Sequence, residues 1–343
     1  MMTDTNFLKM KGIEFVEWTS PQPGKLDELF GGLGFSRLGQ YPGKAIDFYR
    51  QNAIKFILNR EEGDFSAHFR ETHGPSICSM GVRVEDAQFA FEEAVRRGAR
   101  PYDAQTAKAK SIHAYPAIYG IGDSLVYFLD EAVEDQFEAH PEPREVDDKG
   151  FLLIDHLTNN VYKGQMARWS TFYQEVFGFQ EIRYFDIKGQ KTGLTSYALQ
   201  SPCKTFCLPI NEGNEAKSQI EEYLREYSGE GIQHIAFLAD ELLDSLDELE
   251  GTGIEFLDIM PEYYEDVFDR VPNVVESHKR IEDHNVLVDG DEEGYLLQIF
   301  TQNIVGPIFI ELIQRKNHHS FGEGNFKALF ESIERDQARR GVL

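Results

Sequence analysis

The stretch GIQHIAFL, residues 231–238, has the length and apolar content of a buried strand, although a histidine stands in its middle. Leucines follow at helical spacing over residues 242–249, and Gly251 comes soon after them. Glycine often ends a helix, because it adopts a left-handed backbone without strain. The stretch therefore predicts a strand, followed by a helix that stops at a glycine.

The same order of strand, helix and glycine occurs at three further places in the chain. These are the strand Gly12–Trp18 with a helix from Leu26 to Leu33 and Gly34, the strand Ile77–Val84 with a helix Asp86–Arg97 and Gly98, and the strand Phe151–Leu157 with a helix Met166–Val176 and Gly178. Shorter strands complete the units, among them Ser124–Leu129, Tyr295–Phe300 and Ile308–Gln314. We therefore predict an α+β protein built from four βαβββ modules, two in each half.

An acidic segment separates the two halves. Residues Glu131–Gly150 read EAVEDQFEAHPEPREVDDKG, with two prolines and no hydrophobic period, which is typical of a linker. We predict an N-terminal domain over residues 1–138, a linker over 139–150 and a second domain over 151–343.

Composition excludes several classes of function. The chain has 343 residues, enough for about two domains, and a net charge of −25, which argues against binding to nucleic acid or to anionic membranes. Its three cysteines indicate a reducing compartment. No signal-peptide core and no membrane-spanning run is evident. We therefore expect a cytoplasmic protein.

Three residues form a candidate metal site. His156 and His234 each stand alone in an apolar strand, where a histidine is more often an ordinary core residue. Glu311 is more informative, because its same-face neighbours Phe309 and Ile313 are apolar. A carboxylate buried among such residues needs a cation, either a divalent metal or an arginine.

The spacing of these residues favours the metal. His234 follows His156 by 78 residues, and Glu311 follows His234 by 77, so we expect the histidines to face each other across a cupped sheet. Two imidazoles and one carboxylate leave about three positions of an octahedral ion open, as in non-haem iron(II) oxygenases. In the first half, Ser79 aligns with His234 and the strand from Ile13 to Trp18 has no histidine, so we predict a metal-free domain there.

The repeat and the ligands together resemble the vicinal oxygen chelate superfamily. The C-terminal half further resembles the 4-hydroxyphenylpyruvate dioxygenase family. The matching motifs are GIQHIA at 231–236, LVD at 287–289, LLQIFT at 296–301, FIELIQR at 309–315, FGEGNF at 321–326 and LFESIE at 329–334. Most of residues 151–343 take part, whereas residues 1–138 match in layout only. The resemblance implies two vicinal-oxygen-chelate domains, each a cupped, open barrel-like sheet of two modules, with a C-terminal lid helix.

The resemblance also implies roles for individual residues. His156, His234 and Glu311 would hold Fe(II), and no catalytic residue is expected beyond this metal centre. Gln233 is next to His234, so a regular strand would turn it to the other face; it would act through a bulge or through a network behind the ligands. The implied substrate-binding residues are Ser196, Asn211, Gln219, Gln233, Gln298, Phe300, Phe309, Asn325 and Phe326.

The implied activity converts 4-hydroxyphenylpyruvate and O₂ to homogentisate and CO₂ in tyrosine catabolism, within a homodimer or homotetramer. The substrate carries its own 2-oxo acid, so no second 2-oxo acid is needed. The alternatives are a 4-hydroxymandelate synthase with the same substrate and triad, an extradiol ring-cleaving dioxygenase, and a non-enzymatic binding protein. The extradiol enzyme would need an additional histidine as general base.

Overall fold

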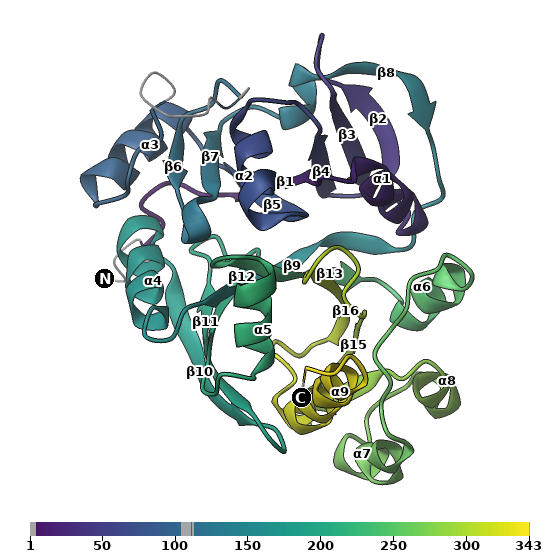
Figure 1. The fold of residues 1–343 in the computed structure, drawn as a ribbon. Coiled ribbons are helices and arrows are strands. Elements are labelled where there is room, and N and C mark those ends of the chain that lie inside the picture. Colours follow the sequence, from purple (N-terminus) through teal and green to yellow (C-terminus); the bar gives the residue numbers. More distant parts are fainter. Residues whose placement is uncertain (1–4, 104–110, 112, 343) are drawn as a thin grey trace.

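The computed structural model describes residues 5–103, 111 and 113–342, and these form two domains, each built on one eight-stranded sheet. Figure 1 shows the first sheet in purple and blue above the second in teal, green and yellow. The predicted α+β class with paired modules is therefore confirmed. No helix of the described residues is long and apolar enough to cross a membrane.

The first domain contains one complete module and one shorter module. Its elements are β1 (Gly12–Thr19), α1 (Pro23–Gly32), β2 (Ser36–Gln40), β3 (Ile46–Gln51), β4 (Ile54–Asn59), α2 (Phe65–His73), β5 (Ser76–Arg83), α3 (Ala87–Arg96), β6 (Ala117–Tyr119), β7 (Leu125–Leu129) and β8 (Glu138–Arg144). The strand order is β6-β7-β5-β1-β4-β3-β2-β8. The second module thus has β5, β6 and β7 together, while β8 crosses to the far edge.

Strand β8 lies inside the acidic segment, residues 131–150, that we interpreted as a linker. It pairs with β2, where Gly39 is opposite Ala139 and Gln40 is opposite Glu138. Prolines and charged residues are tolerated on an edge strand, and they hide the alternating pattern by which a strand is recognised. The structure therefore differs from the prediction here, and the domain boundaries at 138 and 151 stay predictions.

The second domain contains two complete modules. The first consists of β9 (Phe151–Val161), α4 (Met166–Phe172), a π-helical turn (Tyr173–Phe177), β10 (Gln180–Lys188), β11 (Gly193–Gln200) and β12 (Cys207–Gly213). The second consists of β13 (Gly231–Ala239), α6 (Leu242–Leu249), α7 (Val267–Arg270), α8 (His278–Asp283), β14 (Leu287–Gly290), β15 (Tyr295–Phe300) and β16 (Phe309–Lys316). The strand order β10-β11-β12-β9-β13-β16-β15-β14 makes β9 and β13 the central pair.

Phenylalanines join the two domains behind strand β13. The ring of Phe237 lies 5.8 Å from that of Phe35 and 6.0 Å from that of Phe56, both in the first domain. The ring of Phe151, in the second domain, lies 5.5 Å from the ring of Phe237 and belongs to the same cluster. Because alternate residues of a strand point to opposite faces, His234 and Ala236 point away from this cluster. The first domain therefore supports the back of a strand whose front carries a candidate ligand.

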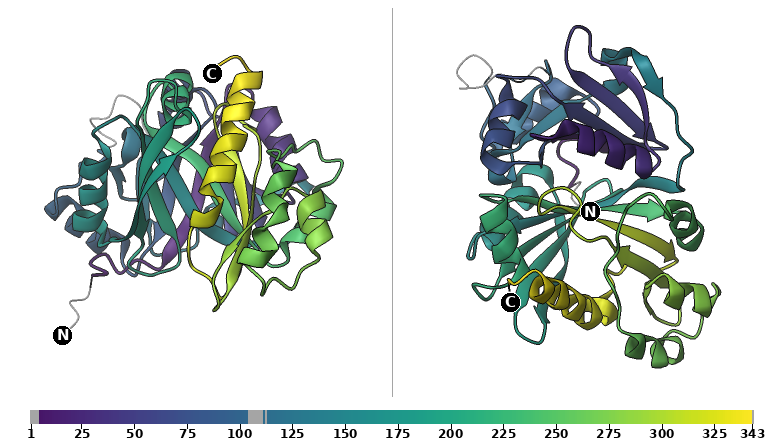
Figure 2. Two further views of the ribbon diagram at one scale, coloured as in Figure 1. Left: turned by 90° about the horizontal axis from the view of Figure 1, so that it is seen from below. Right: turned by 45° about the vertical axis from the view of Figure 1, so that its right-hand side comes forward.

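Helix α9 (Phe326–Arg339) covers the open side of the second sheet, beside α5 (Gln219–Glu226). In Figure 2 it is the long yellow helix that crosses the sheet. Glu334 anchors it to the β10–β11 turn, where its carboxylate accepts hydrogen bonds from the backbone N–H groups of Gln190, Lys191 and Thr192 at 2.9–3.1 Å. The end of the helix is tied to α5 by an ion pair between Arg340 and Glu222.

Candidate metal centre

The three predicted ligands lie on three adjacent strands in the middle of the second sheet. His156 is on β9, His234 on β13 and Glu311 on β16, and both His156 and Glu311 are paired in register with Ala236. Their ligand atoms all lie within 4.8 Å of one another. Our expectation that the histidines face each other across the cup was wrong, because β9 and β13 are hydrogen-bonded neighbours.

The Glu311 carboxylate is the centre of the cluster. Its Oε2 lies 3.0 Å from Nε2 of His156 and 3.5 Å from Nε2 of His234, and its Oε1 accepts a hydrogen bond of 3.4 Å from Gln298. No lysine or arginine of the described residues forms an ion pair with it. Of the two cations that the sequence left open, the structure thus favours the metal.

The distances suit an ion between these side chains. Two ligand atoms at right angles around an ion, each roughly 2.1 Å from it, are about 3.0 Å apart. The separation of 3.0 Å equals this value, and the separation of 3.5 Å corresponds to a wider angle at the ion. All three side chains are buried, and two imidazoles with one carboxylate are donors that divalent first-row metals accept. The residues therefore fit a divalent metal.

The pKa values of His156, Glu311 and His234 depend on one another. Burial lowers the pKa of His156, but the charge of Glu311 and the hydrogen bond to Asp155 outweigh it and raise the pKa to about 9. Burial raises the pKa of Glu311, but His156 and His234 outweigh it and lower the pKa to about 2. Burial dominates at His234 and lowers its pKa. Without a metal ion, a proton on His156 therefore balances the negative charge of Glu311.

The two histidines are oriented by different contacts. Nδ1 of His156 lies 2.8 Å from Oδ1 of Asp155, an arrangement that leaves Nε2 free for a metal. His234 is instead stacked on Phe309, with ring centroids 4.6 Å apart and planes at 19°. Its Nδ1 is buried and has no hydrogen-bond partner among the described residues.

A β-bulge lies beside each of these histidines. The register between β9 and β13 shifts at Asp155, next to His156, and again at Gln233, next to His234. A bulge turns a side chain from one face of a sheet toward the other, so Asp155 can reach the ring of its own neighbour. Gln233 likewise reaches the pocket and donates to Gln219 at 3.4 Å. The bulge that we considered for Gln233 is therefore present.

A pocket lies over the three candidate ligands and under α9. Eight of the nine predicted substrate-binding residues line it, namely Ser196, Asn211, Gln219, Gln233, Gln298, Phe300, Phe309 and Phe326. Asn325 does not. It is fully buried behind Gln298, to whose Oε1 it donates at 3.1 Å, so it can orient the side-chain amide of Gln298.

Further residues line the pocket that the sequence did not indicate. They are Thr158, Phe185, Ile187, Leu194, Pro209 and Phe321. Leu329, Phe330 and Ile333 of α9, which belong to the predicted lid helix, line it too. Phe185 and Ile187 alternate along β10, and this strand pattern was a usable signal. Phe321 follows β16 in a loop, where no periodicity exists; its ring meets that of His156 edge-on at 5.8 Å.

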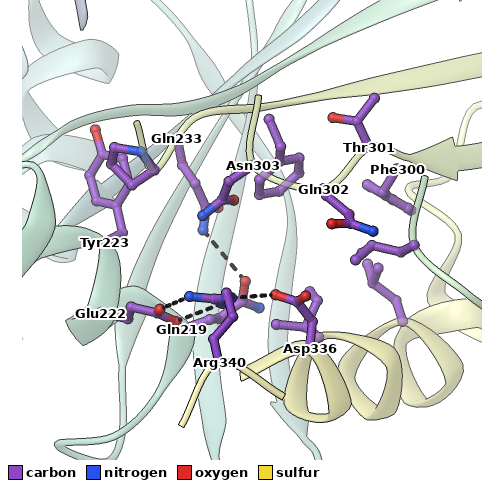
Figure 3. Close-up of a pocket in the computed structure, with 15 residues that line it drawn as sticks. Gln219, Glu222, Tyr223, Gln233, Phe300, Thr301, Gln302, Asn303, Asp336 and Arg340 are labelled. Carbon is purple, nitrogen blue, oxygen red and sulfur yellow. Dashed lines mark hydrogen bonds and ion pairs between the residues drawn. The ribbon is translucent and has the colours of Figure 1, made fainter. Parts of the chain in front are cut away.

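The pocket continues into a narrower hollow that Figure 3 shows. The two share Gln219, Gln233 and Phe300, and the second also reaches Glu222, Asp336 and Arg340. Arg340 donates to Asp336 at 2.8 Å and pairs with Glu222. The hollow therefore runs along α9 to the ion pairs that fasten the end of this helix.

In the first domain, the position that aligns with His234 carries other chemistry. Ser79, which aligns with His234, donates a hydrogen bond to the buried carboxylate of Glu17. Asn59 donates to the same carboxylate at 2.8 Å, and His113 is 3.4 Å from it. Glu17 therefore has protein donors as partners.

Comparison with known proteins agrees with this site. The model for the N-terminal part of hydroxyphenylpyruvate dioxygenase (HPPD) matches residues 5–144, and that for the glyoxalase, bleomycin resistance protein and dioxygenase superfamily matches residues 153–297. The first match corrects our expectation that the N-terminal half resembles the family in layout only.

Individual relatives match over the whole chain. Protein MelA of Shewanella colwelliana is 56% identical over 100% of both chains. The 4-hydroxyphenylpyruvate dioxygenase of Legionella pneumophila is 44% identical over 100% of this chain and 99% of its own. A solved structure of a mutant 4-hydroxymandelate synthase from Streptomyces coelicolor has a TM-score of 0.81 and 25% identity, covering 96% of this chain and 99% of the other. From its fold, its clustered histidines and glutamate and these full-length matches, the chain belongs to the 4-hydroxyphenylpyruvate dioxygenase family.

Proposed function

We propose that the protein is a non-haem iron(II) dioxygenase that converts 4-hydroxyphenylpyruvate and O₂ to homogentisate and CO₂. The observation that carries this proposal is the place of His156, His234 and Glu311 at the base of an aromatic pocket under α9. When bound, iron(II) supplies the one-electron chemistry that O₂ requires and open positions for a chelating 2-oxo acid.

The charges around the pocket support a 2-oxo acid that binds at the metal. Apart from Glu311 and the two histidines, the described residues that line the pocket are uncharged. A substrate carboxylate that enters such a pocket needs a cation, since an unpaired buried charge is costly. Without a lysine or arginine in this lining, the metal is the cation that can hold it.

The remaining lining suits a hydroxyphenyl ring. Phe185, Phe309 and Phe326 supply apolar walls, and aromatic rings favour edge-on or offset contact with one another. Ser196 and Asn211 stand opposite each other on β11 and β12 and offer neutral donors and acceptors for a phenol. Leu329, Phe330 and Ile333 of helix α9 add further apolar side chains to the same lining.

The main alternative is a 4-hydroxymandelate synthase, because the chain is similar to the solved structure of a mutant of that enzyme. Both activities use one substrate, so the product decides between them. An extradiol ring-cleaving enzyme is less favoured, because no third histidine lines the described part of the pocket. The cytoplasmic location and the homodimer or homotetramer stay predictions.

The test is metal analysis of the purified protein, followed by O₂ uptake and product chromatography with 4-hydroxyphenylpyruvate, iron(II) and ascorbate. We expect about one iron per chain and homogentisate as product. Hydroxymandelate in its place would support the synthase. His234→Ala should lose both metal and turnover, whereas His284→Ala, which removes a surface partner of Asp247, should keep both. Turnover in His234→Ala would refute the metal centre.

A further inference from the structure

Arg315, near the end of β16, contacts both the partner of a candidate ligand and the chain that leads to the lid. Its Nε donates to Oδ2 of Asp155 at 2.8 Å and its Nη2 donates to Oδ1 at 2.9 Å. Its Nη1 donates to the backbone carbonyls of His318 at 3.2 Å and Ser320 at 2.6 Å. One guanidinium thus uses all three nitrogens, and its fixed fork sets the relative position of these groups.

Asp155 transmits this position to the candidate ligand. Its Oδ1 accepts from Arg315 and also lies 2.8 Å from Nδ1 of His156. The bulge at Asp155 brings it to this side of the strand. A carboxylate held on both oxygens by a guanidinium has little freedom, so the ring of His156 is held as well.

The loop after β16 also contacts the ring of His156. Phe321 meets the ring of His156 edge-on, with centroids 5.8 Å apart. The following Gly322 is so close to Gln298 that a Cβ atom there would lie 1.8 Å from Oε1. This loop therefore packs against the ring of His156 through Phe321 and against the side chain of Gln298 through Gly322.

We propose that Arg315 is a positioning residue, which couples the seating of residues 317–321 to the orientation of His156 through Asp155. Metal affinity and order in this loop then depend on each other, as thermodynamic linkage requires. This role of Arg315 rests on the proposed metal centre.

The test measures Co(II) affinity of the metal-free protein under argon, by competition with a chromogenic chelator. Arg315→Gln should weaken the affinity by about 10- to 100-fold, the range seen when partners of metal ligands are removed. Arg315→Lys keeps the charge without the fork and should fall in between. Arg340→Gln is the matched control, since it removes an arginine that fastens α9 but contacts neither Asp155 nor His156; its affinity should stay within about twofold of wild type.

Hydrogen exchange provides the second readout. Co(II) should slow exchange at residues 317–321 in the wild type and in Arg340→Gln, but not in Arg315→Gln. If Arg315→Gln does not fold, Asp155→Asn serves in its place with the same expectations.

The results separate this inference from the proposed function. A wild type that binds no Co(II) contradicts the metal centre itself. A wild type that binds, together with a folded Arg315→Gln variant of unchanged affinity or unchanged loop protection, overturns the role of Arg315 alone.

Discussion

His156 and His234 differ in what holds them. A hydrogen bond to Asp155 orients His156, whereas stacking on Phe309 orients His234. A hydrogen bond fixes which nitrogen carries the proton, and stacking fixes only the plane of the ring. The two residues should therefore respond differently to pH and to substitution of their neighbours.

Metal binding should release a proton. In the metal-free protein the pKa of His156 is about 9, so the ring is protonated at neutral pH, and only the neutral ring binds a metal. Below pH 9 the apparent affinity should therefore rise with pH, by about tenfold per unit. Calorimetric titration with Co(II) in two buffers of different ionisation enthalpy measures the protons released. A value near zero at pH 7.5 would contradict the protonated state.

Phe309→Leu should weaken metal binding although Phe309 is no ligand. The substitution keeps an apolar wall but removes the ring stacked on His234, an interaction worth about 0.5–1.5 kcal/mol, or roughly two- to tenfold in affinity. Phe326→Leu is the control, because Phe326 contacts Phe185 rather than a ligand. It should change the KM for substrate and leave Co(II) affinity as it is; equal affinities in both variants would count against the stacking.

At the scale of elements, the carboxylate of Glu334 makes most of the hydrogen bonds between α9 and the β10–β11 turn. Glu334 accepts from three successive backbone N–H groups and from the Thr192 hydroxyl at 3.0 Å. Successive amides that converge in this way bind anions well. The charge of Glu334 therefore matters more than its size.

Glu334→Gln should loosen α9 while the rest of the fold stays intact. Hydrogen bonds to a charged acceptor contribute about 1.5–3 kcal/mol, so local opening of α9 and of residues 190–192 should become easier by a similar amount. Hydrogen exchange followed by mass spectrometry measures this. Glu331→Gln removes a carboxylate from the same helix that accepts only from the side chain of Gln190, and it should leave exchange nearly unchanged. Similar exchange in both variants would argue against the anchor.

Elements with a strong local pattern could be predicted from the sequence. The four repeats of strand, helix and glycine all form, and Gly34 and Gly178 have the expected positive φ of 85° and 83°. Strand β8 was not predicted, because its pairing with β2 depends on a partner about 100 residues away. Its prolines and charges carry no local strand signal.

The candidate site likewise contains residues that a local sequence pattern indicates and residues that only the folded structure brings together. His156, His234 and Glu311 stand out as polar residues in apolar strands, so their pattern alone indicates them. Asp155 and Arg315 look like ordinary charged residues, since only a bulge and a contact across 160 positions bring them together. Asn325 matched the family motif, but its place behind Gln298 depends on packing that no motif describes.

At the scale of the whole molecule, the first domain acts as a support for the second. Phe35 and Phe56 pack on Phe237, at the back of the strand that carries His234. Because protein interiors are densely packed, displacement at the back of a strand is transmitted to its front. The N-terminal domain thus contributes to the site without supplying a candidate ligand.

Phe237→Ala should destabilise the protein strongly. Truncation of a fully buried phenylalanine costs about 3–5 kcal/mol, and Phe237 is 0% exposed. Urea unfolding of the metal-free protein measures the loss. Phe89→Ala is the control, since Phe89 is 48% exposed and its truncation should change stability by about 0.5 kcal/mol at most. A loss below about 1 kcal/mol for Phe237→Ala would show that the domains do not depend on this contact.

The stack of Phe309 on His234 also restricts how such a protein can diverge. Phe309 is both a wall of the pocket and the holder of a candidate ligand, so a mutation there that alters substrate choice also alters cofactor retention. Phe326 and its neighbours on α9 line the pocket, and the ring contact of Phe326 is with Phe185 rather than with either candidate histidine. New specificities should therefore be acquired first through the terminal helix, and directed-evolution libraries aimed at new substrates should begin with it.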